Sequence, residues 1–408
     1  KMKGRLWGTF NGKRFIKPTD LFFKPFESHL EGIEHVLSSN DHTACLGIKK
    51  GDTKKWIYTL GNNSNGECGR PGKEKYFLPV PVVVNPQHTL DAIGGMYTGR
   101  SQLFAVDETR QQVYGTGLND YGQLGIADQM GKKVTTLTFI DELSDTLAKK
   151  NHEVLSIVNK GSFTLVLTQH REDPSDQALF ASGANHHHEL NHACKPYSTF
   201  KDLLPYYRKY TKALNNVEIA EISCGNTHVV LLTRCHRLFS RGRGKEGQLG
   251  TPKDPSVNPM HAMHFIEHAP LEEPLYNIRS GFHYNVALGK DTKNVYCWGA
   301  GVEGHRFWGN PANGQQLATP NSHPIKVIYE SKPDDPVVQL AAGSQHVLFR
   351  TTSSQLFSYG TGFDGELCDE KQGQHIDHPI LVPLTKGTLV SHVFAGDGFS
   401  GCLGQFCD

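Results

Sequence analysis

A short glycine-rich string recurs along this 408-residue chain, and it constrains the fold more than any other feature of the sequence. The clearest copy is VYGTGLNDYGQLG at Val113–Gly125, and LFSRGRGKEGQLG at Leu238–Gly250 is closely similar. Each copy has an aliphatic and an aromatic residue four and three positions before a glycine. The marking glycines, spaced 53 to 66 residues apart, are Gly8 (in a degraded copy), Gly61, Gly117, Gly183, Gly242, Gly299 and Gly360. Such spacing predicts one supersecondary unit used repeatedly.

Each unit also carries a second glycine-marked string that leads into a short apolar run. GNTHVVLL at Gly225–Leu232 and GSQHVLFR at Gly343–Arg350 are the clearest copies, and a turn followed by such a run is typical of a strand. The other copies begin at Ser39, Gly99, Gly161, Gly281 and Gly396. Seven such units predict an all-β, seven-bladed β-propeller spanning 1–408 as one domain. Its repeats begin near residues 5, 57, 113, 179, 238, 295 and 356.

The two ends of the chain carry complementary parts of the repeat. The chain starts with a strand of the first type, at Leu6–Gly8, and ends just after a strand of the second type, at Cys402–Leu403. We therefore expect the first and last segments to pair within one blade, which removes an open sheet edge.

The core string G-x-N-x-x-G-Q-L-G is met closely at Gly117–Gly125 and in part at Gly242–Gly250 and Gly61–Gly69. It resembles the regulator-of-chromosome-condensation repeat, as do the Gly-x-x-His strand starts at His228 and His346. The resemblance covers almost the whole chain and implies four-stranded blades. It does not fix one function, because the family includes a Ran exchange factor, a plant ultraviolet-B receptor, parts of ubiquitin ligases, ciliary GTPase regulators, and bacterial inhibitors and effectors.

One string suggests quite different chemistry. His188-Glu189-Leu190-Asn191-His192 spells H-E-x-x-H, which on a helix holds zinc in metallopeptidases. In the repeat alignment, however, His188 takes the place of a turn glycine, Glu189 that of Gln, and Leu190 that of a buried Leu. A turn does not place two histidines on one helical face, and histidine tolerates positive φ better than most residues. We expect a turn without metal or cofactor; zinc catalysis is the minor alternative.

Departures from the repeat mark candidate binding segments, because insertions in such proteins map to exposed loops. The segment 192–216 inserts aromatic and basic residues into the fourth repeat, with a short helix expected near Pro205. In the sixth repeat, Arg306, Phe307 and Trp308 stand where G-Q-L-G is expected. The candidate partner-binding residues are Lys195, Tyr197, Phe200, Tyr206, Tyr207, Arg208, Lys209, Tyr210, Arg306, Phe307 and Trp308. The alternative for 192–216 is a helix packed flat on the propeller.

The segment Thr251–Pro274 also interrupts the repeat, and it contains four histidines. No carboxylate or thiol pattern accompanies His261 and His264, so we expect an ordinary loop there.

The composition narrows the functional classes. Lys+Arg number 42 and Asp+Glu 41, so the chain has no large net positive charge that would attract nucleic acid. No apolar run is long enough to span a membrane. The nine cysteines form no C-x-x-C pair, which favours a reducing compartment: the cytoplasm, with the nucleus or a host cytosol as alternatives. No cofactor or covalent chemistry is expected, and we expect a monomer.

The family resemblance implies a protein-binding propeller with a small GTPase as partner, acting as an exchange factor or a docking platform. The inserted hairpin by which the Ran exchange factor displaces nucleotide has no match here. The alternative is a scaffold, adaptor or bacterial effector propeller without exchange activity.

Overall fold

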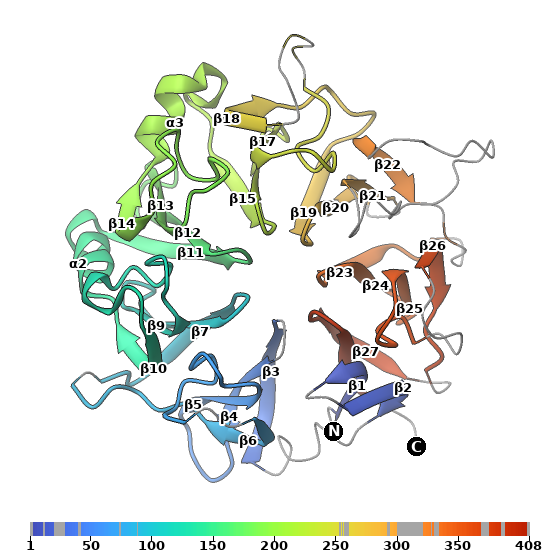
Figure 1. The fold of residues 1–408 in the computed structure, drawn as a ribbon. Helices are drawn as coiled ribbons and strands as arrows, with labels where there is room; N and C mark the ends of the chain where they lie inside the picture. The colour runs from blue at the N-terminus through green and yellow to red at the C-terminus, as the bar shows by residue number, and fades with distance from the viewer. Residues whose placement is uncertain are drawn as a thin grey trace.

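The computed structural model describes residues 3–10, 13–19, 29–39, 42–72, 75–87, 89–252, 254, 256, 261–291, 294–299, 321–327, 329, 334–368, 375–384 and 388–405. Their strands form seven four-stranded antiparallel sheets arranged around a central axis (Figure 1). The prediction of an all-β propeller with four-stranded blades is confirmed.

The first four sheets in ring order come from the N-terminal half of the chain and from both termini. From the axis outward they are β27 (Leu389–Ala395), β28 (Phe399–Gln405), β1 (Lys3–Phe10), β2 (Lys13–Thr19); β3 (Leu30–Ser38), β4 (His42–Lys49), β5 (Lys55–Gly61), β6 (Tyr76–Pro81); β7 (Ile93–Thr98), β8 (Gln102–Asp107), β9 (Val113–Leu118), β10 (Lys133–Phe139); and β11 (His152–Asn159), β12 (Phe163–His170), β13 (Gln177–Gly183), β14 (Tyr197–Asp202).

The remaining three sheets follow in chain order. They are β15 (Ile219–Cys224), β16 (His228–Thr233), β17 (Leu238–Arg243), β18 (His261–Glu267); β19 (Leu275–Ser280), β20 (Tyr284–Gly289), β21 (Val295–Gly299), β22 (Asn321–Val327); and β23 (Val337–Ala342), β24 (His346–Thr351), β25 (Leu356–Thr361), β26 (His375–Leu381). The sequence repeats thus begin at the third strand of each blade, and the Gly-x-x-His strings lead into the second.

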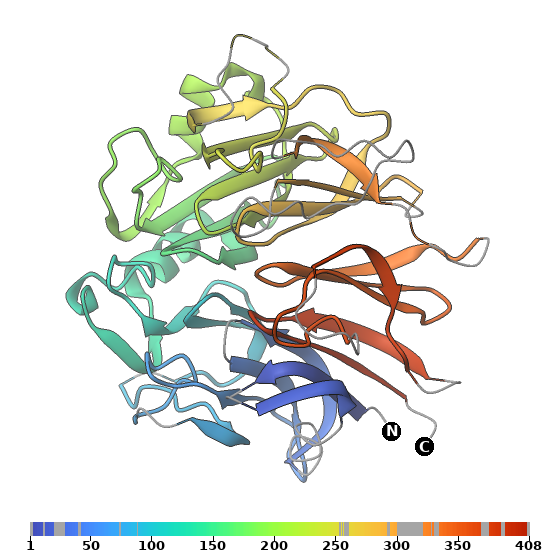
Figure 2. The same cartoon turned by 45° about the vertical axis from the view of Figure 1, so that its right-hand side comes forward.

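The two ends of the chain share one sheet. β1 pairs antiparallel with β28, with Lys3 opposite Gly404 and Gly8 opposite Phe399. The termini accordingly lie side by side in both views (Figures 1 and 2). The predicted pairing of the first and last segments is confirmed.

The first glycine of each repeat is required by a close approach between strands. Gly117 has φ +113°, and a Cβ on it would lie 2.1 Å from the carbonyl oxygen of Ser101, at the start of the second strand. Gly183, Gly242 and Gly299 face the equivalent carbonyls at 2.3–2.5 Å. Any side chain there would push the second and third strands apart.

Histidines of the Gly-x-x-His strings link one blade to the next. The ring nitrogen Nε2 of His228 lies 2.9 Å from Oδ1 of Asn285, and that of His346 lies 2.9 Å from the Ser400 hydroxyl. Both partners are side chains of the adjacent blade. Burial lowers the pKa of His228 to about 4, so this histidine is neutral at physiological pH.

Within the described residues, two α-helices interrupt the sheets, whereas the sequence predicted one short helical or irregular insertion. α3 (Leu204–Tyr210) lies in the expected segment, and α2 (Asp141–Lys150) was not anticipated. Short 3-10 helices lie before α2, at η1 (Ala127–Gln129), and after α3, at η2 (Lys212–Leu214). The prediction of an ordinary loop at Thr251–Pro274 is wrong, because β18 lies within it. None of the helices in the described ranges has the length and apolar character that a membrane span requires.

Candidate interaction surface

The string H-E-x-x-H lies in a turn, which we call the His188 turn (Asn185–Asn191). Asn185 organises it: its Oδ1 accepts the Leu190 N–H at 2.8 Å, and its Nδ2 donates to the Asn191 carbonyl at 3.1 Å. His188 has φ +60°, as predicted for its glycine position. His188 and His192 therefore do not share the helical face that zinc binding by this motif needs. Among the described residues, no group of three or more potential ligands could hold a metal ion.

Glu189 performs the same task as the glutamine of the regular repeat. Its Oε2 accepts the His187 N–H at 2.8 Å, as Oε1 of Gln123 accepts the Tyr121 N–H at 2.9 Å. Glu189 is 3% exposed, and this burial raises the pKa of its carboxyl group to about 7. The nearby guanidinium of Arg241 opposes the shift.

Arg241, on β17 of the next blade, joins the His188 turn to its neighbours. Its Nε donates to the His188 carbonyl at 2.9 Å, and its Nη2 donates to the Met263 carbonyl at 2.7 Å. The guanidinium lies 5.0 Å from the ring centre of Tyr207 and 5.4 Å from that of Phe265. Because Arg241 is buried and bonded on two sides, it fixes the turn, α3 and β18 in one arrangement.

The segment 192–216 supplies the outer strand of its blade as well as a helix. β14 pairs with β13, so only the residues after Asp202 depart from the regular blade. On α3, Leu204 and Tyr207 face inward, and the Tyr207 ring meets that of Phe265 edge-on at 4.8 Å. Figure 1 shows α3 at the outer edge of the ring beside β18.

The outer side of α3 carries a group of rings that we call the rim cluster. Tyr210 stacks on His264 at 4.8 Å with an interplanar angle of 3°, and Tyr206 lies 4.8 Å from Tyr210. His192 stacks on Tyr206, and its Nδ1 lies 2.7 Å from the Tyr206 hydroxyl. Tyr210 is 45% and Met263 48% exposed. The rim cluster is defined as these four rings together with the exposed Met263, which precedes His264 on β18: His192, Tyr206, Tyr210, Met263 and His264.

The structure divides the predicted contact residues into two groups. Lys195, Lys209 and Tyr210 are exposed, and Tyr197, Tyr206 and Arg208 are half-buried. Phe200 and Tyr207 are 4% and 2% exposed, so they hold the segment in place and do not present their rings to a partner. Arg306, Phe307 and Trp308 lie outside the described residues.

Sequence reasoning missed four residues that shape this surface: His192, Arg241, Met263 and His264. Arg241 precedes a repeat glycine, where other copies have Leu60, Thr116 and Ser182. A charged residue at this position could have been used to predict a buried contact, because an arginine there must find buried partners. The alternation of apolar residues through Met263 and Phe265 was a usable strand signal.

The rim cluster has the chemical character of a protein-binding surface. Exposed tyrosine and methionine are enriched at the centre of interfaces, and basic residues such as Lys209 flank them here. The rings rest on a buried arginine and on packed secondary structure, so little conformational entropy is lost when a partner binds.

Comparison of the sequence with known proteins gives distant relatives. No family model matches the chain. It is 23% identical over 299 residues to the ultraviolet-B receptor UVR8 of Arabidopsis thaliana, covering 73% of this chain and 60% of the receptor. It is 24% identical over 296 residues to the secretion-regulating guanine nucleotide exchange factor of Bos taurus, covering 71% of this chain and 56% of that protein. The chain thus spans less than two thirds of the length of either relative.

Solved structures match over the whole chain. Human WBSCR16 superposes with a TM-score of 0.77 at 16% identity, with both chains covered completely. Prp20p of Saccharomyces cerevisiae, whose binding to Gsp1p and histones has been studied, superposes with a TM-score of 0.73 at 18% identity over 100% of this chain and 92% of Prp20p. At these identities the likeness shows the fold alone.

Proposed function

The chain belongs to the regulator-of-chromosome-condensation-type repeat family, and from this premise we propose that it is a non-catalytic protein-binding propeller whose partner is a small GTPase. Two similar proteins support a GTPase-related role: one is named a guanine nucleotide exchange factor, and the other is a propeller studied for its binding to Gsp1p. The family also includes a Ran exchange factor. The binding surface we assign is the rim cluster.

The exposure of Tyr210 and Met263 carries this proposal. Both side chains are about half exposed, although they sit on a helix and a strand that are firmly packed beneath. The Lys209 ammonium, 5.4 Å from the ring centre of Tyr210, adds positive charge beside the cluster, which suits a partner with an acidic surface next to an apolar patch.

An effect on nucleotide exchange would be a matter of differential affinity. A propeller that binds the nucleotide-free GTPase more tightly than the nucleotide-bound form lowers nucleotide affinity by the same factor. Equal affinity for both forms makes the propeller a docking platform that leaves exchange unchanged. The two roles therefore differ in a measurable ratio.

The test uses the full chain and a panel of purified small GTPases. Binding to the nucleotide-free, GDP-bound and GTP-bound forms is measured by calorimetry, and release of a fluorescent GDP analogue is followed in parallel. We expect the double variant Tyr210→Ala, Met263→Ala to weaken binding at least about tenfold, as for truncation of interface anchors. Its free energy of unfolding should change by less than about 0.5 kcal/mol for each exposed site.

Phe363→Ala provides the matched control, because Phe363 is 60% exposed on a turn of a different blade. It should bind like the wild type. Faster GDP release assigns exchange activity, and binding with unchanged release assigns a docking role. The proposal fails if no GTPase in any nucleotide state binds, or if the double variant binds as well as Phe363→Ala.

A further inference from the structure

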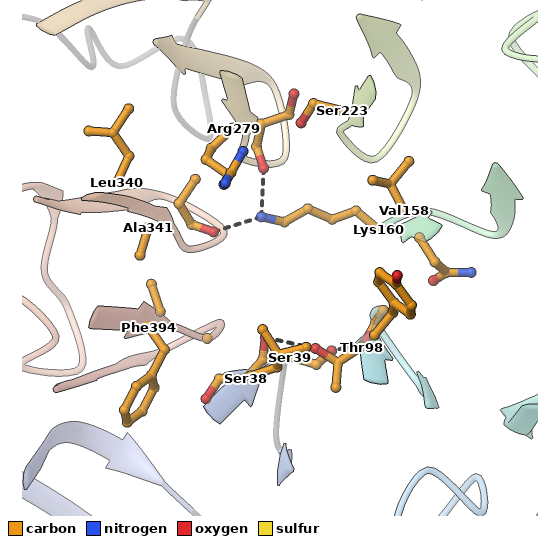
Figure 3. Close-up of a pocket in the computed structure, with 18 of the residues that line it drawn as sticks. Ser38, Ser39, Thr98, Val158, Lys160, Ser223, Arg279, Leu340, Ala341 and Phe394 are labelled. Carbon is orange, nitrogen blue, oxygen red and sulfur yellow. Dashed lines mark hydrogen bonds between the residues drawn. The ribbon is translucent and has the colours of Figure 1, made fainter. Parts of the chain in front are cut away.

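A cavity of about 360 Å³ lies on the axis of the propeller, away from the rim cluster. It is lined by the innermost strands of the sheets and by the turns that follow them (Figure 3). This volume falls within the range of sites that hold small molecules.

Lys160, on the turn between β11 and β12, lines the cavity. Its ammonium group donates to the carbonyl oxygens of Ser280 at 2.7 Å and Ala342 at 2.9 Å (Figure 3), and to that of Gly343 at 3.2 Å. Ser280 and Ala342 belong to two other blades, so the side chain reaches across the axis. All three ammonium protons are used in this way.

The turns around Lys160 are linked to one another. The Asn226 N–H donates to the Phe282 carbonyl at 3.1 Å, the Phe282 N–H to the Ser344 carbonyl at 3.0 Å, and the Ser344 N–H to the Gly396 carbonyl at 3.2 Å. This belt of backbone hydrogen bonds keeps the turns beside Lys160 rigid. A ligand would therefore meet a preformed wall.

The charge of the cavity wall has one sign. The described residues that line it include Lys160, Arg100 and Arg279, with His35 and His392, and they include no aspartate or glutamate. Just outside this lining, the Glu221 carboxylate lies 3.7 Å from Nη1 of Arg279. Asp397 acts on Lys160 only through the electrostatic field, and burial lowers the pKa of Lys160 to about 8. The ammonium is thus still mainly protonated at neutral pH, held by carbonyl dipoles.

We propose that the axial cavity binds a small oxyanion, a molecule bearing phosphate or carboxylate groups. Nη1 of Arg279 donates to the Ile278 carbonyl at 2.8 Å and lies beside Glu221, but the side chain is 47% exposed. Its other N–H groups and the guanidinium of Arg100 are the planar donors for such oxygens, whereas Lys160 contributes charge because its protons are already engaged. Ser223 and Thr98 also line the cavity, Ser223 on the side of Arg279 and Thr98 on the opposite side (Figure 3). This site is independent of the rim cluster and of the GTPase proposal.

The test is calorimetric titration of the full chain with inorganic phosphate, pyrophosphate and citrate, each against potassium chloride at equal ionic strength. We expect saturable binding of at least one oxyanion below about 10 mM, and binding at least about tenfold weaker in Arg279→Gln, which removes a charge-assisted contact. Comparison of pyrophosphate with citrate distinguishes phosphate from carboxylate ligands.

Lys149→Gln is the control, since Lys149 is an exposed lysine on α2 whose loss changes the net charge equally. It should bind like the wild type. Arg100→Gln removes the other planar donor and should also weaken oxyanion binding. The proposal is overturned if no oxyanion binds above the chloride baseline, or if Lys149→Gln weakens binding as much as Arg279→Gln.

Discussion

Two turns of the propeller share one backbone design and differ in what the neighbouring blade presents to them. The Gly122 turn (Asn119–Gly125) and the His188 turn are both organised by an asparagine: Asn119 Oδ1 accepts the Leu124 N–H at 2.9 Å, as Asn185 accepts that of Leu190 at 2.8 Å. In both turns, the residue two positions after the asparagine donates its N–H to a buried side chain. Tyr121 donates to Gln123, and His187 donates to Glu189.

The neighbours decide which side chains each turn can carry. A Cβ on Gly122 would lie 2.6 Å from Cα of Ser198 in the next blade, so only glycine fits there. Facing the His188 turn, the next blade instead places Arg241, which bonds the His188 carbonyl at 2.9 Å. The equivalent contact at the Gly122 turn is a hydroxyl: Ser182 donates to the Gln123 carbonyl at 3.1 Å.

This difference explains where the repeat could change. Arg241 takes the place of a serine beside the turn that carries histidine, and it also supports Tyr207 and Phe265. One residue thus contacts both the altered turn and the rings beneath the rim cluster.

The largest expected effect comes from exchanging the residue types of the two turns. Gly122→His forces a side chain into positive φ, +82°, and into the backbone of β14, so we expect it to lower the free energy of unfolding by about 3 kcal/mol or more. His188→Gly should change it by no more than about 1 kcal/mol, because glycine adopts φ +60° freely. Urea denaturation measures both. Equal effects would show that the neighbouring blade does not decide the turn residue.

A smaller effect is expected from Arg241→Met. The change leaves the His188 and Met263 carbonyls without their donor, and each buried unsatisfied group costs about 1–3 kcal/mol. We expect a loss of about 2–3 kcal/mol in unfolding free energy, partly offset by the apolar side chain. Arg241→Lys, which retains the charge without the planar fork, should lose less. A neutral Arg241→Met would mean that the arginine does not support the turn.

Much of this fold could be predicted because the spacing of the repeat is visible in one sequence. The paired termini followed from where the chain starts and ends within the repeat, and the turn at His188 followed from alignment with Gly122. In contrast, α2 was missed even though its ends carry the expected charges, Asp141 and Glu142 first and Lys149 and Lys150 last.

The candidate surface was predictable only in part. The aromatic content of 192–216 pointed to the right segment, but burial of Phe200 and Tyr207 depends on the adjacent turn and on Phe265, which are distant in sequence. The partners of Arg241 lie 53 and 22 residues away, so its role could not be inferred from local pattern. Met263 and His264 were hidden by the expectation of a loop.

The smallest effect separates the two turns by pH. The pKa of Glu189 is raised from 4.5 to about 7, so its contribution to stability is fully present below pH 4.5 and is lost as the pH rises through 7. Glu189→Gln, which can accept the same N–H as Gln123 does, should be more stable than the wild type above pH 7 by about 1–2 kcal/mol, less than the full linkage value because Arg241 loses its nearby carboxylate. The advantage should vanish near pH 4.5.

Gln123→Glu is the reciprocal variant. Because Ser182 stands there in place of an arginine, this variant should lose more stability over the same pH range than Glu189→Gln gains. Thermal unfolding between pH 4.5 and 8 measures both, and parallel profiles for wild type and Glu189→Gln would contradict a buried, protonatable Glu189.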